Sequence, residues 1–426
     1  MKRTASTLLL AVSFLAALSA HAGKVRAVRH PLPAPPNTGP TFNRDIVRIL
    51  QANCQSCHHA GDIAPFPLVT YDDAKSHASL IKFMTLTKKM PPWKPAGGCG
   101  EFDAERRLST EEIATIGKWV DSGAPEGEAS DLPAPLVFDS EWALGEPDLV
   151  LANDEPFTPP PHVDTYRCFT LPTNLIADKY VSAIDTHPGD RATVHHVISF
   201  IDTTGESVKL DEADPGPGYT CFGGPGFDLP GTLGGWAPGM RGLQLPKEVA
   251  FELPATSRVV LQVHYHPHNA QPAPDRTQFG IYFAKETPKN IMRVVPLVNQ
   301  TFTIPPNNSN YEVTAKFPIA TPFPTKIWFI APHMHLLGRK MSVEMTPPNG
   351  ASQCLINIDD WEFNWQGAYL YKNPIDVPAG TRLSLRAIYD NSSENPRNPN
   401  SPPRAVSWGE ATTDEMCIAF LGMTVE

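Results

Sequence analysis

From about residue 150 onward, the chain consists of short stretches in which apolar and polar residues alternate. Examples are VSAIDTH at 181–187, RVVLQVHYH at 258–266 and KIWFIAPHMH at 326–335. A period of two is typical of β-strands. Pro, Gly and Asn separate the stretches, and the 426 residues include 46 prolines, which favours all-β architecture over helical bundles. About 280 residues of this pattern are enough for two β-sandwiches.

An internal echo suggests that the β part contains two copies of one unit. LPATSRVVLQVHY at 253–265 aligns without gaps on VPAGTRLSLRAIY at 377–389, and FTLP at 169–172 is echoed by FTIP at 302–305. Chance similarity between amphipathic strands is the alternative, but the echoes occur in the same order. We therefore predict an N-terminal sandwich over 150–290 and a C-terminal one over 291–426.

The part before residue 150 has a helical pattern instead. Apolar residues recur at helical spacing after Asn43, a second helix is expected over 71–87, and a third opens with the capping-box pair Ser109 and Glu112. The sequence predicts a small all-α domain over 41–127, followed by an acidic linker over 128–149.

The first residues have the pattern of a secretory signal peptide. Lys2 and Arg3 precede an apolar run, and AHA at 20–22 offers small residues for cleavage, so residues 1–22 are predicted to be removed. The alternative, a membrane anchor, needs an apolar run of about 20 residues, and this run is shorter. We expect a periplasmic or secreted protein with no membrane span in the mature chain. A formal charge of −10 argues against nucleic-acid partners.

The stretch CQSCH at 54–58 has the spacing of a c-type haem attachment site. Cys54 and Cys57 would bind the haem covalently and His58 would reach its iron, whereas a redox or zinc C-x-x-C is the alternative. Met90, which lies before two prolines, is the predicted sixth ligand. The stretch 41–127 resembles a class I cytochrome c, in which Cys99 has no role.

Grouped histidines in the β part predict metal sites. His333 and His335 are two residues apart, so they face the same side of a strand and can hold one ion. His195 and His196 would face opposite sides unless the strand bulges there, so a metal site predicts such a distortion. His264 supplies a third imidazole. Imidazoles without a carboxylate suit copper or zinc.

The internal repeat distinguishes the two sites. Ile388 takes the place of His264 in the second copy, so the pair His333 and His335 needs another ligand. Met416 is the best candidate, although a lone methionine is more often a core residue. A thioether is a soft ligand that suits Cu(I). Lone histidines on strands are more often structural than ligating, and this class is predicted to include His162, His187, His266 and His268.

Five stretches of the β part resemble the copper type II, ascorbate-dependent monooxygenases. They are DTYRCF (164–169), TVHHVISF (193–200), LQVHY (261–265), HMHLLG (333–338) and DEMC (414–417). The resemblance runs from about residue 150 to the end, and it implies two jelly-roll-like sandwiches facing a cleft. The expected fold class is therefore a small all-α cytochrome c domain followed by two all-β jelly-roll-like sandwiches.

The resemblance also implies roles for the candidate ligands. One copper ion, the electron relay, would be held by His195, His196 and His264. The other, which binds O2 and hydroxylates the substrate, would be held by His333, His335 and Met416.

Three positions depart from the peptide-amidating members of the family. Those members carry Arg, Asn and Tyr where this chain has Ala331, Ile418 and Phe420, so a glycine-extended peptide is not the expected substrate. The family's disulfides are also thinned out. Cys168–Cys221 and Cys354–Cys417 are the pairings considered.

The sequence thus predicts an exported copper-dependent monooxygenase that hydroxylates a C–H bond of a small, rather apolar substrate with O2. The covalent haem would supply electrons, drawn from ascorbate or a redox partner protein. The alternative is a non-catalytic electron-transfer cytochrome whose β part stores or senses copper. A weaker one is a structural β-module that docks the cytochrome to a partner.

Overall fold

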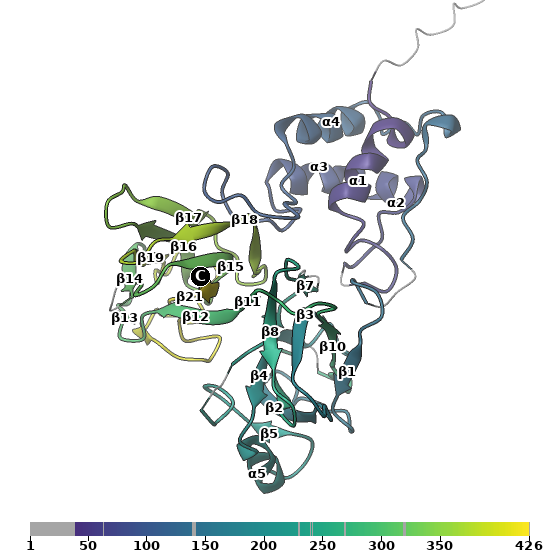
Figure 1. The fold of residues 1–426 in the computed structure, drawn as a ribbon. Coiled ribbons are helices and arrows are strands. Elements are labelled where there is room, and N and C mark those ends of the chain that lie inside the picture. Colours follow the sequence, from purple (N-terminus) through teal and green to yellow (C-terminus); the bar gives the residue numbers. More distant parts are fainter. Residues whose placement is uncertain are drawn as a thin grey trace, which may run out of the picture. The chain divides into compact units, whose positions relative to one another are not determined.

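The computed structural model describes residues 39–425, except 63, 139–141, 229–230, 239, 241, 268–269 and 318–320. The predicted signal peptide and His268 lie outside the described residues. Strands make up 34% and helices 13% of the structure. Residues 40–426 make up one unit of the chain. Figure 1 labels its helices and strands.

The first pair of sheets contains the strands before residue 292. A six-stranded sheet has the order β1-β10-β3-β8-β11, with β7 paired to β3, and a five-stranded sheet has the order β5-β2-β9-β4-β6. The strands are Leu149–Ala152 (β1), Thr165–Pro172 (β2), Lys179–His187 (β3), Val194–Asp202 (β4), Tyr219–Thr220 (β5), Gly234–Trp236 (β6), Leu243–Gln244 (β7), Val249–Leu253 (β8), Arg258–Tyr265 (β9), Gln278–Phe283 (β10) and Asn290–Ile291 (β11). Both sheets contribute side chains to one core, for example Ile184 and Val263.

The second pair of sheets follows. Its two four-stranded sheets have the orders β12-β21-β15-β18 and β14-β19-β16-β17, and β13 pairs with β20 beside them. The strands are Arg293–Val298 (β12), Thr303–Ile304 (β13), Tyr311–Lys316 (β14), Thr325–His333 (β15), Gly338–Thr346 (β16), Gln353–Ile358 (β17), Tyr369–Val377 (β18), Arg382–Tyr389 (β19), Val406–Ser407 (β20) and Ile418–Val425 (β21). Side chains of both sheets, such as Ile330 and Leu385, share a second core.

Alternation explains which face of a strand is buried. In β14, Val313 and Ala315 enter the second core, whereas the alternating residues Glu312, Thr314 and Lys316 are exposed. In β21, Ala419 and Leu421 enter the same core. The residues that alternate with them, Ile418 and Phe420, line a cavity on the other side of the sheet. This division of β21 is what positions the candidate site.

The helices are short. A π-helix at Phe42–Ile46 leads into Val47–Asn53 (α1), and Tyr71–Ser76 (α2), Ala78–Leu86 (α3) and Thr110–Asp121 (α4) follow; Glu206–Ala213 (α5) lies among the strands, and Ala129–Asp131 forms a 3-10 turn. The predicted capping box of α4 is confirmed. Ser109 Oγ accepts the Glu112 N–H at 3.1 Å, and the Glu112 carboxylate accepts the Ser109 N–H at 2.7 Å.

The predicted fold class is wrong, because the structure is mostly β and no small all-α cytochrome c domain is evident among the described residues. Helices form in the predicted stretches, although the one expected over 71–87 is broken at His77 into α2 and α3. Between α3 and α4 the chain leaves the helices and joins the second pair of sheets. Pro95 bridges to Ile358, and Phe102 bridges to Tyr371 and is buried in the second core. Residues 93–103, called the strap below, thus belong to the β packing.

A disulfide fastens the strap. Cys99 is bonded to Cys354 of β17, and a second disulfide joins Cys168 to Cys221. The pairing Cys168–Cys221 is confirmed, whereas Cys354–Cys417 is wrong, because Cys417 is buried as a free thiol. Such a long-range bond could not be read from the spacing of cysteines along the chain.

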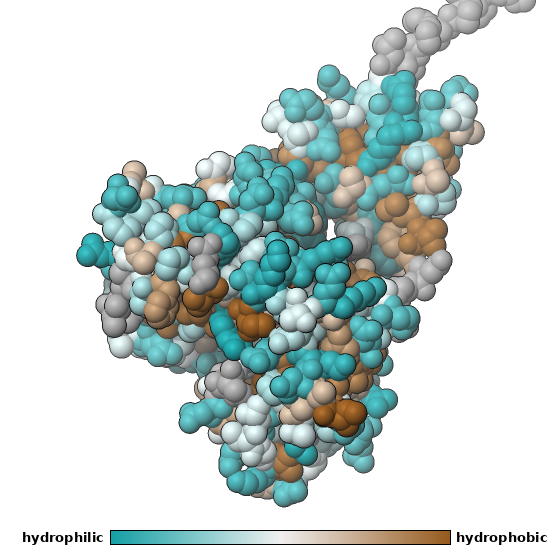
Figure 2. Space-filling view, viewed as in Figure 1, coloured by the Kyte–Doolittle hydropathy of each residue, from teal (hydrophilic) through white to brown (hydrophobic). Residues whose placement is uncertain are grey.

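The molecular surface is mixed in polarity. Figure 2 shows hydrophilic side chains over much of the visible face, with apolar ones in separate patches. Among the described residues, no helix has the length and hydrophobicity needed to cross a membrane.

Candidate metal centre

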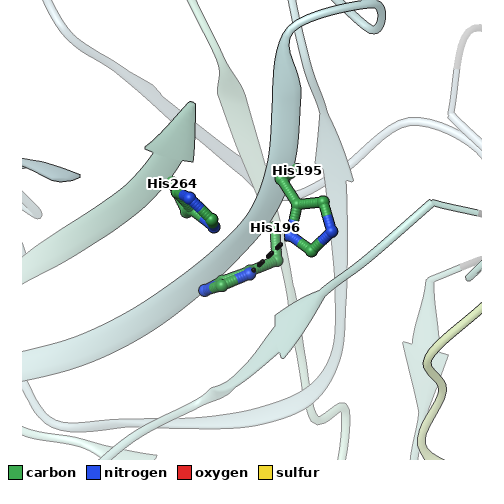
Figure 3. Close-up of side chains that lie close together, drawn as sticks. All are labelled: His195, His196 and His264. Carbon is green, nitrogen blue, oxygen red and sulfur yellow. Dashed lines mark hydrogen bonds between the residues drawn. The ribbon is translucent and has the colours of Figure 1, made fainter. Parts of the chain in front are cut away.

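Three histidines of the five-stranded sheet form a first group. His195 and His196 lie near the start of β4, and His264 lies on the neighbouring β9, as Figure 3 shows. One ligand atom from each ring lies within 4.8 Å of the others. We call His195, His196 and His264 the first triplet.

A strand irregularity brings the adjacent histidines to one side. The register of β4 against β9 shifts between Val194 and His196, and Nδ1 of His195 lies 3.1 Å from Nδ1 of His196 (Figure 3). A bulge re-aims side chains that would otherwise alternate. The predicted distortion is confirmed.

The donors of the first triplet fit a metal ion. His264 is buried, and both of its ring nitrogens lack a hydrogen-bond partner. A buried polar atom without a partner is costly unless something else satisfies it. The Tyr166 ring stacks on His264 with centroids 4.2 Å apart and fixes the plane of the imidazole. A metal ion between the three rings would supply the missing interaction.

A second group lies on the sheet that contains β15 and β21. His333 ends β15 and pairs with Ile418 of β21. His335 follows His333 by two residues, Met416 precedes Ile418 by two, and the side chains of His333, His335 and Met416 line the same cavity. Residues two apart share a face, which puts both imidazoles and the thioether on the same side. The ring centroids of His333 and His335 are 5.1 Å apart. We call His333, His335 and Met416 the second triplet.

Hydrogen bonds orient the two imidazoles of the second triplet. Nδ1 of His333 donates to Oε1 of Gln366 at 2.5 Å, and Nδ1 of His335 donates to the carbonyl oxygen of Asp414 at 3.1 Å. Each ring therefore carries its proton on Nδ1 and leaves Nε2 available. Histidine ligands of metal ions are commonly held in this way by a second hydrogen bond.

A buried carboxylate that the sequence analysis missed holds these segments together. Glu415 accepts the backbone N–H groups of His335 at 2.9 Å, Leu337 at 2.6 Å and Met416 at 3.2 Å. Burial raises the pKa of Glu415 to about 8, although these hydrogen bonds act in the opposite direction. The sequence feature that could have indicated Glu415 is its position in DEMC, where a charged residue stands just before an apolar, strand-like stretch.

Both triplets border one cavity of about 760 Å³. His196, His264 and the whole second triplet line it, and the centroids of His196 and His333 are 6.4 Å apart. Most of the wall is apolar. Its apolar members include Trp236, Met240, Leu243, Phe251, Val294, Phe329, Ala331, Ile418 and Phe420.

One loop of the second pair of sheets contacts both triplets. Phe363 stacks on His195 with centroids 4.5 Å apart and lies edge-on to His335 at 5.9 Å. Gln366, which holds His333, also donates to the Phe363 carbonyl oxygen at 2.8 Å. The strap pairs with strands on either side of this loop, through Ile358 of β17 and Tyr371 of β18.

Burial keeps the imidazoles neutral, as metal ligation requires. It lowers the pKa of His333 to about 4 and that of His335 to about 3. Burial and the neighbouring imidazoles lower the pKa values of His195 and His196 well below the usual value, and burial also lowers that of His264.

These shifts predict that copper affinity at the second triplet changes little between pH 7 and pH 5. An imidazole with a lowered pKa stays neutral until the pH falls to that pKa. At pH 5, His333 and His335 are therefore still neutral and do not have to lose a proton before they bind copper. Each ordinary imidazole would lose roughly 30-fold in affinity over this range. Chelator competition at both pH values measures the change, and a loss of about 100-fold or more would contradict the expectation.

Two further residues near the first triplet were missed. Asp164 and His266 form a group with His264 in which one ligand atom from each residue lies within 4.8 Å of the others. The sequence analysis placed His266 among the structural histidines. His264 and His266 have the same two-residue spacing as His333 and His335, so the same-face rule applied to them as well.

The predicted haem ligands are only partly brought together. Cys54, Cys57 and His58 share one turn after α1, both thiols are free, and Nδ1 of His58 donates to the Phe66 carbonyl oxygen at 2.9 Å. Met90 lies in the turn after α3, where its N–H donates to the Met84 carbonyl oxygen. The hydrogen bonds and ring contacts of the described residues do not join Met90 to His58.

Comparison with known proteins finds a family similar to the second pair of sheets. Residues 288–423 match the family model for the C-terminal domain of copper type II ascorbate-dependent monooxygenases. This match points to a copper-dependent oxidoreductase of the monooxygenase class, with O2 and ascorbate as the co-substrates of the family. No curated protein matches the chain.

Solved structures give weaker likenesses. The major capsid protein P2 of bacteriophage PM2 is 10% identical with a TM-score of 0.27, over 65% of this chain and 97% of that one. A recombinant N-glycanase F is 11% identical with a TM-score of 0.30, over 65% of this chain and 95% of that one. Similarity at these scores carries no conclusion about this chain.

Proposed function

We propose that the protein is a copper-dependent monooxygenase that hydroxylates a C–H bond of a small, apolar substrate. The observation that carries the proposal is one cavity lined by His196 and His264 of the first triplet, which group with His195, and by the two imidazoles and the thioether of the second triplet. The match of residues 288–423 supports the same chemistry.

Each triplet has a distinct part in the proposal. His195, His196 and His264 would hold the copper ion that relays an electron. His333, His335 and Met416 would hold the one at which the substrate is oxidised, since a thioether favours Cu(I). Copper, when bound, supplies the one-electron and O2 chemistry. The protein orients the substrate, excludes water from the cavity and provides neutral ligands.

The cavity wall supports an apolar substrate. Ala331, Ile418 and Phe420, which replace the polar residues of peptide-amidating relatives, all line the cavity. Three ionisable side chains with a formal charge also line it: Arg293 and Glu252 are paired with each other at 3.1 Å, and burial raises the pKa of Glu410. The side chains around the second triplet can therefore exclude water and hold a hydrocarbon group by contact.

The proposal includes a covalent haem at Cys54 and Cys57 as an electron source in an exported protein. Both thiols are free, and the hydrogen bond from Nδ1 of His58 to Phe66 leaves Nε2 available for iron. A further ligand from Met90 is part of the same proposal. Ascorbate or a redox partner protein would reduce the haem or the copper directly.

The function is tested by O2 consumption of the copper-loaded full chain with ascorbate and a panel of apolar substrates. We expect uptake to require copper, to be matched by hydroxylated product, and to keep pace with haem oxidation in the visible spectrum. Tight copper binding without O2 uptake would contradict the enzyme and favour copper storage. If haem does not stay attached to the denatured chain, the haem part of the proposal is wrong. The copper part is then tested by product formation alone.

A further inference from the structure

The pairing of β2 with β9 places four polar or aromatic residues on one face. Thr165 pairs with Tyr265, and Tyr166 pairs with His264. Asp164 immediately precedes β2 and His266 immediately follows β9, so the same register sets them opposite each other. Because side chains alternate, Asp164, Tyr166, His264 and His266 project to the same side of the sheet.

Within this patch, the Asp164 carboxylate lies between the two histidines. Oδ1 of Asp164 is 3.7 Å from Nε2 of His264 and accepts a hydrogen bond from Nδ1 of His266. The Asp164 side chain is 27% exposed, whereas that of His264 is 2% exposed. The Asp164 carboxylate is therefore a charged group close to the buried imidazole of His264, whose ring nitrogens have no hydrogen-bond partner.

The side of the ring that faces the carboxylate matters for ligation. A proton on Nε2 of His264 is attracted to Asp164, which leaves the lone pair on Nδ1. His195 and His196 also turn their Nδ1 atoms toward each other, 3.1 Å apart. Nδ1 is then the nitrogen of His264 that is left to bind an ion.

We propose that Asp164 is a positioning residue of the first triplet, which fixes the tautomer and direction of His264, and that His266 holds the carboxylate in place. The inference rests on the proposed copper function and deepens it. Removing such a carboxylate partner of a ligating histidine commonly weakens metal binding by about 10- to 100-fold.

The test is copper titration of the full chain against a competing chelator, with the spectrum of the cupric form. Asp164→Asn is expected to weaken one of two copper sites by about 10- to 100-fold and to change the spectrum of that site alone. Asp164→Glu should restore most of the affinity, and His266→Gln should have a smaller effect than Asp164→Asn. Asp121→Asn, which removes a carboxylate from an exposed ion pair with Lys82, is the matched control and should change neither site.

Three results would overturn the inference. Asp164→Asn with the affinity and spectrum of the wild type would overturn it alone, since the wild-type sites would remain intact. A third copper equivalent in the wild type that Asp164→Asn loses would mean that Asp164 is itself a ligand, in a group with His264 and His266. A wild-type chain that binds no copper would overturn the proposed function together with this inference.

Discussion

Met416→Ala is expected to abolish substrate hydroxylation while leaving one copper site intact. The substitution removes the thioether and leaves His333 and His335 as a pair, because these three side chains line the same cavity. Loss of a direct ligand should exceed the 10- to 100-fold effects typical of supporting residues, so we expect turnover to fall by roughly 100-fold or more. Product formation and copper stoichiometry measure the change, from two equivalents to one.

Met345→Ala is the matched control for this variant. Met345 is a buried methionine of β16 in the second core, and its truncation should cost stability by about 2–5 kcal/mol without changing copper stoichiometry. If Met416→Ala kept the turnover and the second copper equivalent of the wild type, the assignment of the second triplet would be wrong.

Glu415→Ala is expected to have the largest effect on folding stability. The carboxylate accepts the backbone N–H groups of His335, Leu337 and Met416, and alanine leaves these donors buried without partners. Each unsatisfied donor costs about 1–3 kcal/mol, so with three donors the free energy of unfolding should fall by roughly 3–9 kcal/mol. Denaturant unfolding measures the loss, and copper binding at the second triplet should weaken in parallel.

Glu312→Ala provides the comparison for Glu415. Glu312 forms an exposed ion pair with Arg386 at 2.8 Å, and exposed pairs contribute about 0–1 kcal/mol. A loss of stability for Glu415→Ala no larger than that of Glu312→Ala would contradict the role of Glu415 as the link between the two segments of the second triplet.

Short-range patterns in the sequence predicted the local features of the site. Alternation placed strands around His264 and His333, and the adjacency of His195 and His196 required the irregularity seen at the start of β4. These features depend on residues one or two positions apart, which a sequence displays directly. The same rule would have found His266, had it been applied to the His264 and His266 pair.

Long-range pairing could not be predicted in the same way. The helices α1–α4 were expected, but nothing in the local pattern of residues 93–103 indicated that Phe102 enters the second core or that Cys99 bonds Cys354. The prediction of a separate helical domain was therefore wrong. Glu415 was missed because its role depends on hydrogen bonds from three backbone N–H groups, two of which are 78 and 80 positions away in sequence.

Diffraction from copper-loaded crystals at the copper absorption edge tests the central claim most directly. We predict two anomalous peaks per chain, one among His195, His196 and His264 and the other among His333, His335 and Met416, both beside the same cavity. Peaks at other residues, or no copper at either triplet in fully loaded protein, would contradict it.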